Sequence, residues 1–141
     1  MYKLGLIGRS LKHSFSKKYF DNKFKNEKNN MFSYHIYDLK DLNDLTTIYD
    51  PQLIGINVTR PYKKQIIKHI DKLDISSEET ASVNTIFINP KNKTKTGYNT
   101  DILGFEKLLT RLSLKQNIKA LILGSGGASN TVSYVLNKKN I

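Results

Sequence analysis

The stretch "LILGSGGASNTVSYVL", residues 121–136, joins a short apolar run, a glycine cluster and a helix-like segment. Gly124, Gly126 and Ser129 fall where the G-x-G-x-x-G fingerprint of dinucleotide-binding units places its three small residues, which permit a tight turn, close backbone approach to a pyrophosphate and close helix packing. A helix that starts at Ala128 would turn its first amides, at the positive end of its dipole, toward a phosphate. The stretch therefore predicts a phosphate loop, with a plain strand–turn–helix corner as the alternative.

Strands alternate with helices along the rest of the chain. Apolar alternation and β-branched runs predict strands over 2–8, 31–39, 53–58, 82–88, 96–100 and 117–123. Helical spacing predicts helices over 16–28, 41–49, a segment opened by Pro61, 102–112 and 128–138. This order implies an α/β fold with an open sheet in residues 1–100. Residues 101–141 would add a linking helix and the first strand, glycine loop and helix of a Rossmann-type domain.

The two C-terminal helices have apolar residues at helical spacing, with Gly104 as a weak spot in the first of them. We expect these apolar residues to be buried. They are Leu103, Leu108, Leu109 and Leu112 in the first helix, and Val132, Val135 and Leu136 in the second.

The composition narrows the class of partner. The net charge of +11 comes from 20 Lys against three Arg, spread along the chain. A protein that reads nucleic acid would use the bidentate Arg fork, so attraction of small anions is the better interpretation and a nucleic-acid-binding module the weaker alternative. The chain has no cysteine, which excludes disulfides and thiolate metal sites, and no run approaches the length of a membrane span. We expect a cytoplasmic protein without a metal.

Polar side chains gather just past the expected strand ends, where open α/β sheets place their ligands. They are Ser14 and Ser16 in "GRSLKHSFS", Asn57, Thr59 and Lys63 in "GINVTRPYKK", Asn84 in "ASVNTIF" and Asp101 in "GYNTDILGF". Each also has a structural interpretation: the two serines and Asp101 as helix caps, and Lys63 as part of a solvated helix face. Their occurrence together at strand ends favours a common site.

Five motifs, "GRSLKHSFS", "NVTRPYK", "SVNTI", "YNTDILGF" and "LILGSGGAS", occur in an order and at spacings that resemble the shikimate dehydrogenase family. That family reduces 3-dehydroshikimate with NADPH on the route to chorismate and the aromatic amino acids. The resemblance implies that the substrate pocket is lined by Ser14, Ser16, Thr59, Lys63, Asn84 and Asp101. It implies that Lys63 and Asp101 form the catalytic pair. It also implies that NADP is held by Gly124, Ser125, Gly126, Gly127 and Ala128.

These residue types suit the implied chemistry. Shikimate is a carboxylate with three ring hydroxyls, so hydroxyl, amide and ammonium groups are its natural partners. Hydride transfer to a carbonyl also requires an acid that delivers a proton to the oxygen, and Lys63 with Asp101 can do this as a coupled unit.

The sequence departs from the family pattern at Arg60, where many members carry an apolar residue, and at Thr80–Ser82, which replaces a glycine-containing stretch. The family's nucleotide domain also continues for roughly another hundred residues. We therefore expect the glycine loop to begin a domain whose remainder is absent from this chain. An inactive remnant that binds shikimate without reducing it is the alternative, and a homodimer is left open.

Overall fold

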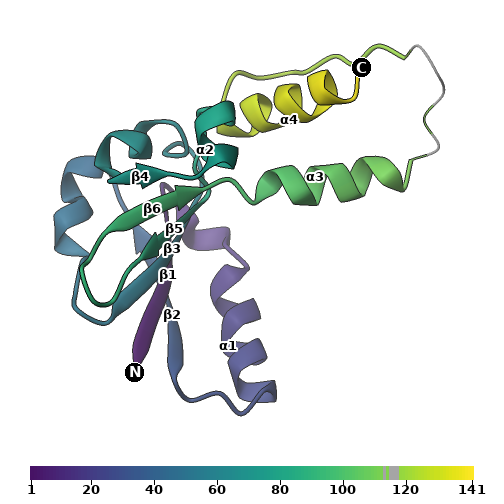
Figure 1. The fold of residues 1–141 in the computed structure, drawn as a ribbon. Helices are drawn as coiled ribbons and strands as arrows, with labels where there is room; N and C mark the ends of the chain where they lie inside the picture. The colour runs from purple at the N-terminus through teal and green to yellow at the C-terminus, as the bar shows by residue number, and fades with distance from the viewer. Residues whose placement is uncertain (113, 115–117) are drawn as a thin grey trace.

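The computed structural model describes residues 1–112, 114 and 118–141, and its centre is a six-stranded mixed sheet (Figure 1). The strands are β1 (Tyr2–Gly8), β2 (Phe32–Asp38), β3 (Leu53–Val58), β4 (Lys72–Leu73), β5 (Thr85–Ile88) and β6 (Lys95–Tyr98), and their order across the sheet is β2-β1-β3-β5-β6-β4. β1 runs parallel to β2 and β3, β5 lies antiparallel to β3 and β6, and β4 runs parallel to β6. The expected α/β sheet is confirmed.

The two faces of the sheet are covered differently. Helix α1 (Ser16–Asn26) lies along β1 and β2, where Phe20 stacks on the buried Tyr34 ring with centroids 4.3 Å apart. The opposite face carries the larger apolar core, whose fully buried members include Ile7, Leu53 and Ile86. Two short 3₁₀ helices, Leu42–Thr47 and Gln65–His69, contribute buried residues to this core. A third, Leu11–His13, lies on the face of α1, where Leu11 packs in the same cluster as Tyr34. The segments expected to be helical over 41–49 and after Pro61 are therefore 3₁₀ turns rather than α-helices.

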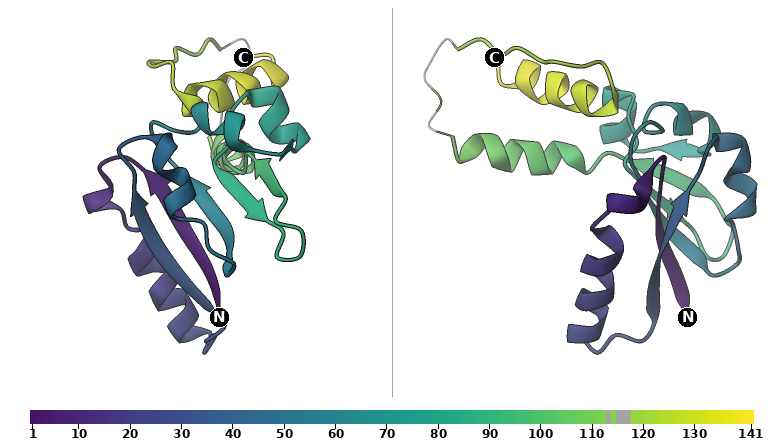
Figure 2. Two further views of the ribbon diagram at one scale, coloured as in Figure 1. Left: turned by 90° about the vertical axis from the view of Figure 1, so that its left-hand side faces the viewer. Right: turned by 180° about the vertical axis from the view of Figure 1, so that it is seen from behind.

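Two helices form an arm that extends away from the sheet. α3 (Asp101–Thr110) and α4 (Gly127–Lys138) lie side by side in the views of Figures 1 and 2, while the short α2 (Ile75–Thr80) lies at the base of α4. Their shared core contains Ile102, Leu109, Val135 and Leu136. The expected helices and the burial of these last two α4 residues are confirmed, and Val132 packs against the same core while half-buried.

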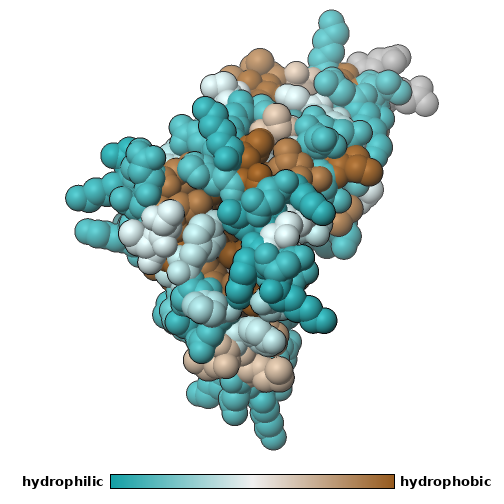
Figure 3. Space-filling model, turned by 60° about the vertical axis from the view of Figure 1, so that its left-hand side comes forward, coloured by the Kyte–Doolittle hydropathy of each residue, from teal (hydrophilic) through white to brown (hydrophobic). Residues whose placement is uncertain are grey.

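The expectation that Leu103, Leu108 and Leu112 point inward is wrong. Their exposed fractions are 62%, 53% and 51%. Among the described elements, α4 is the helix that packs on α3, and this contact covers a single stripe of the α3 surface. Figure 3 shows apolar side chains at the surface in the upper part of the molecule.

The strand predicted over 117–123 is not formed in residues 118–123, and residue 117 lies outside the described residues. The segment runs extended along α4, with Leu121 and Leu123 exposed at 84% and 88%. A strand needs backbone partners, and none of the six strands of the described sheet pairs with this segment. Residues 118–123 therefore have a strand-like sequence but no strand of the described sheet to pair with.

Replacing Gly104 by alanine is expected to stabilise the protein by about 0.5–1 kcal/mol. Gly104 lies within α3, and a methyl group at this position would meet no atom within 4 Å. Alanine therefore lowers the conformational entropy of the unfolded chain and causes no steric clash in the folded protein. Urea unfolding of the two proteins measures the difference, and an equal or lower midpoint for Gly104→Ala would contradict this view of α3.

Candidate functional site

Three of the predicted site residues meet in one ionic cluster. Lys63 Nζ donates to Asp101 Oδ2 at 2.6 Å, and Asn84 Nδ2 donates to Asp101 Oδ1 at 2.8 Å. Lys63 lies in the turn after β3, Asn84 immediately precedes β5, and Asp101 is the first residue of α3. The side chain of Lys63 is 18% exposed and that of Asp101 39%, so the pair lies at the surface end of a partly shielded site.

Three other predicted residues, Ser14, Ser16 and Thr59, line a cavity of about 260 Å³. Arg9 and Arg60 also line it, and among the described residues no carboxylate belongs to this lining. Hydroxyl groups and guanidinium charges together favour an anion. Arg60, a departure from the family pattern, therefore adds positive charge to this cavity.

The alternative of simple helix capping applies only in part to the serines. Ser14 Oγ accepts a hydrogen bond from the Ser16 amide at 3.3 Å, a local turn contact. The N-cap position of α1, however, is occupied by Phe15, whose side chain makes no cap hydrogen bond. A serine hydroxyl also has a hydrogen to donate, so this contact leaves Ser14 able to bind an anion.

A chain of hydrogen bonds joins the cavity to the ionic cluster. The Tyr34 hydroxyl donates to Asn57 Oδ1 at 2.8 Å, Asn57 Nδ2 approaches Thr85 Oγ1 at 3.4 Å, and the Thr85 hydroxyl donates to Asn84 Oδ1 at 3.1 Å. Burial raises the pKa of Tyr34 to about 12, and the neighbouring Ser16 hydroxyl opposes that rise. The six predicted residues thus form two groups that are linked through polar side chains, and Ser14, Ser16 and Thr59 are the group that lines the 260 Å³ cavity.

Local sequence patterns carry little sign of these linked hydrogen bonds. The alternation of residues 32–38 marks Tyr34 as a core residue, and its hydroxyl partner lies 23 residues away on another strand. Asn57 is visible as a polar residue at a strand end, but the pattern assigns it no partner. Pairings of this kind depend on which strands become neighbours.

The predicted phosphate loop lies against the ionic cluster. Gly124 has a φ of 127°, in the region that favours glycine, and Gly126 occupies the N-cap position of α4. A methyl group on Gly127 would lie 2.6 Å from Lys63 Cβ and 2.7 Å from Ser82 Oγ, so only glycine fits this contact. Lys64 Nζ donates to the Ser125 carbonyl oxygen at 2.9 Å and ties the loop to the turn after β3.

Asn99 fixes the helix behind this loop. Its Nδ2 donates to Thr80 Oγ1 and to Thr131 Oγ1, both at 2.8 Å, and its Oδ1 accepts from the Asp101 amide at 3.2 Å. Asn99 and Thr131 are each 2% exposed, so these bonds are shielded from water. One amide side chain therefore connects α2, the start of α3 and α4, a role that the motif "YNTD" did not reveal.

Asp74, which caps α2, is expected to make the free energy of unfolding depend on pH in the acidic range. Its carboxylate accepts from the Ser76 hydroxyl and amide, and these bonds hold the pKa of Asp74 below its ordinary 3.8. Because the folded pKa is the lower one, this stabilisation is complete above about pH 4 and is lost as the pH falls through the folded value. Unfolding free energies measured between about pH 2 and 6 should show a smaller acid loss for Asp74→Asn than for the original chain.

Within the described part of the chain, no three His, Asp or Glu side chains gather to form a metal site. No described helix is long and apolar enough to cross a bilayer.

The family described as "Shikimate dehydrogenase substrate binding domain" matches residues 6–86. Curated relatives named "Shikimate dehydrogenase (NADP(+))" include one from Clostridium botulinum, 34% identical over 99% of this chain and 55% of its own length. Another, from Methanococcus maripaludis, is 37% identical over 97% of this chain and 50% of its own.

Solved structures agree. Shikimate dehydrogenase 1 from Peptoclostridium difficile superposes with a TM-score of 0.86 at 30% identity, over 98% of this chain and 53% of that one. The Thermus thermophilus enzyme, solved in complex with shikimate, gives 0.81 at 25% identity, over 100% of this chain and 54% of that one. The chain spans about half the length of the relatives it matches. The match over residues 6–86 and the fold shared with these enzymes show that this chain belongs to the shikimate dehydrogenase family.

Proposed function

We propose that the chain binds 3-dehydroshikimate and shikimate and carries the proton-transfer pair for their NADPH-dependent interconversion. The observation that carries the proposal is the contact of 2.6 Å between Lys63 Nζ and Asp101 Oδ2, made across 38 residues of sequence beside an anion-favouring cavity. An exposed lysine on a solvated helix face would not require such a partner.

The cavity and the cluster divide the recognition of the substrate between them. The hydroxyls of Ser14 and Ser16 can donate to the substrate carboxylate, and Thr59 lies beside them. Lys63, Asn84 and Asp101 offer donors and acceptors to the ring oxygens. Lys63 or Asp101 then exchanges a proton with the oxygen whose carbon gains or loses the hydride.

The residues of the glycine loop fit a pyrophosphate. A methyl group added at Gly124 or Gly126 would meet no atom within 4 Å, so the space beside the backbone is open and a ligand can approach it closely. We assign NADP binding to Gly124–Ala128, and NADP would supply the hydride when bound. Because Gly127 packs on the stem of Lys63, the loop and the proton-transfer pair are held next to each other.

We also propose that the chain divides at Thr100. Residues 1–100 would form the substrate-binding unit, and residues 101–141 the linking helix and the start of the nucleotide-binding unit. The apolar residues of α3 and α4 form a core separate from the larger core of the sheet, and this supports the division.

Calorimetric titration with shikimate and an NADPH oxidation assay with 3-dehydroshikimate test the proposal together on this chain. Saturable binding that is weakened by Ser14→Ala supports the substrate site, with Lys12→Ala, on the exposed turn outside the cavity lining, as the matched control. Turnover in addition supports the complete reaction, whereas binding without turnover selects the inactive substrate-binding remnant. Absence of both would reject the assignment.

A further inference from the structure

A second groove, of about 360 Å³, lies at the far end of the strands that build the proposed substrate site. Its walls are formed by Tyr49, Pro51, Leu53 and Ile88, its rim is formed by Lys93 and Lys95, and Asp50 also belongs to its lining. β3 begins at Leu53 and the antiparallel β5 ends at Ile88, so the groove and the Asn57–Asn84 region occupy opposite ends of the same strand pair. None of these residues has a part in the proposed function, and this inference does not depend on it.

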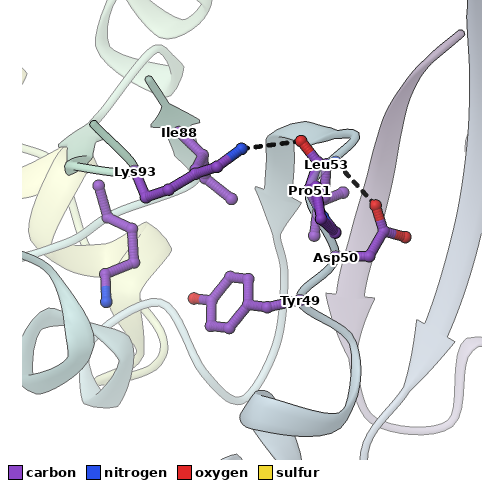
Figure 4. A pocket seen from close by; sticks show the side chains of 7 residues that line it. Tyr49, Asp50, Pro51, Leu53, Ile88 and Lys93 are labelled. Atoms are coloured by element: carbon purple, nitrogen blue, oxygen red, sulfur yellow. Dashed lines mark hydrogen bonds between the residues drawn. The ribbon is translucent and has the colours of Figure 1, made fainter. Parts of the chain in front are cut away.

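The charges around the groove favour an anion. The Asp50 carboxylate accepts from Lys3 Nζ at 2.8 Å and from the Gln52 amide at 2.8 Å, and Figure 4 shows it directed away from Tyr49 and Lys93. Lys93 reaches across the groove in the same view, and its Nζ donates to the Pro51 carbonyl oxygen at 2.8 Å. Its ammonium therefore has a neutral partner, and its charge is available to a carboxylate.

The walls favour an aromatic body. Leu53 and Ile88 are buried, the Tyr49 ring is half-buried, and Lys95 Nζ lies 5.6 Å from the centroid of that ring. A flat apolar group can pack on the Tyr49 ring and the aliphatic walls. Lys95 Nζ also lies 3.7 Å from Asp71 Oδ1, a long contact in which the ammonium keeps donors for a second anion.

The Tyr49 hydroxyl adds an independent indication. It is buried and has no hydrogen-bond partner among the described residues, which is an uncommon and costly state for a polar group. Burial, with the nearby Asp71 charge, raises the pKa of Tyr49 to about 12, so the group is a donor at neutral pH. A ligand with an acceptor oxygen would satisfy it once the flexible lysine rim adjusts.

We propose that this groove is a binding site for a small aromatic carboxylate, with the ring against Tyr49, Leu53 and Ile88 and the carboxylate at the Lys93–Lys95 rim. A neutral aromatic molecule would lose the contact with the ammonium groups. An inorganic anion would lose the contact with the walls. Both parts of the ligand are therefore required.

Benzoate is the probe, titrated into the ¹⁵N-labelled chain and followed by amide chemical shifts. Saturable shifts are expected at residues 49–53, 86–88 and 93–95, and benzamide, the neutral analogue of the same shape, should bind about tenfold more weakly. Lys93→Met and Lys95→Met each keep an apolar stem and should lower benzoate affinity about tenfold. Lys91→Met, in the exposed turn between β5 and β6, is the matched control and should leave the affinity unchanged.

Several results would overturn the proposal. They are equal affinity for benzamide and benzoate, equal affinity for inorganic phosphate, an equal loss in Lys91→Met, or shifts confined to the serine cavity around residues 9–16 and 59–60. In each variant, unchanged amide shifts of residues away from the groove would establish that the protein is folded. A loss of benzoate affinity then reports on the groove itself.

Discussion

Replacing Lys63 by methionine is expected to lower the turnover of 3-dehydroshikimate by at least about a hundredfold while shikimate affinity falls by less than about tenfold. The ammonium of Lys63 contacts the Asp101 carboxylate at 2.6 Å and is its shortest described partner, so its loss removes one half of the proposed proton-transfer pair. Methionine keeps the stem that packs on Gly127. Turnover is measured as NADPH oxidation, and it requires a protein that turns over 3-dehydroshikimate before the substitution is made. Shikimate affinity is measured by calorimetry.

Lys64→Met is the matched control for this substitution. Lys64 is the next residue, is exposed, and donates to the Ser125 carbonyl oxygen rather than to the carboxylate. Its replacement should affect nucleotide binding more than the proton transfer. Equal losses of turnover and shikimate affinity in Lys63→Met would show that Lys63 is a binding residue and not part of a proton-transfer pair.

Replacing Gly127 by alanine is expected to destabilise the protein by about 1–3 kcal/mol and to loosen α4 from the sheet domain. The added methyl group would lie 2.6 Å from Lys63 Cβ and 2.7 Å from Ser82 Oγ, and Lys63 Cβ is too close to the backbone to move away freely. Alanine also has the better helix propensity, worth up to about 1 kcal/mol, but the clash is the larger effect. Urea unfolding and hydrogen exchange of the amides in residues 128–138 measure the two consequences.

Gly126→Ala supplies the control one residue earlier. A methyl group there meets no atom within 4 Å, and the φ of −79° is accessible to alanine. At an N-cap position alanine costs roughly 0.5–1 kcal/mol relative to glycine, and no steric clash adds to that cost here. If both substitutions had the same effect, the loop would not be packed on Lys63, and the proposed contact between the cofactor loop and the proton-transfer pair would be wrong.

The predictable part of the fold is local. β1 and β3 have the predicted bounds, Tyr2–Gly8 and Leu53–Val58, because apolar alternation and β-branched runs are properties of adjacent residues. α3 and α4 begin within one residue of their predicted starts for the same reason. The inward face of α3 was predicted wrongly at Leu103, since burial depends on how many neighbours a helix has.

The predictable part of the site is the set of polar residues at strand ends, together with the motifs that resemble a known family. The sequence suggested that Lys63, Asn84 and Asp101 belong together, and the structure brings them into contact. It did not suggest that Tyr34 and Asn57 join the two groups of site residues, or that Asn99 ties Asp101 to α4. Motif order carries no distance between side chains on different strands.

The sequence by itself determined most of the strands and α-helices, the glycine loop and the family, because each depends on residue types and their spacing along the chain. The tertiary structure decided which strands are neighbours, and so which side chains share hydrogen bonds. It also decided that residues 118–123 are not a strand, since a strand needs a backbone partner that no local pattern can provide. Spacing is a property of the chain, whereas contact is a property of the packed molecule.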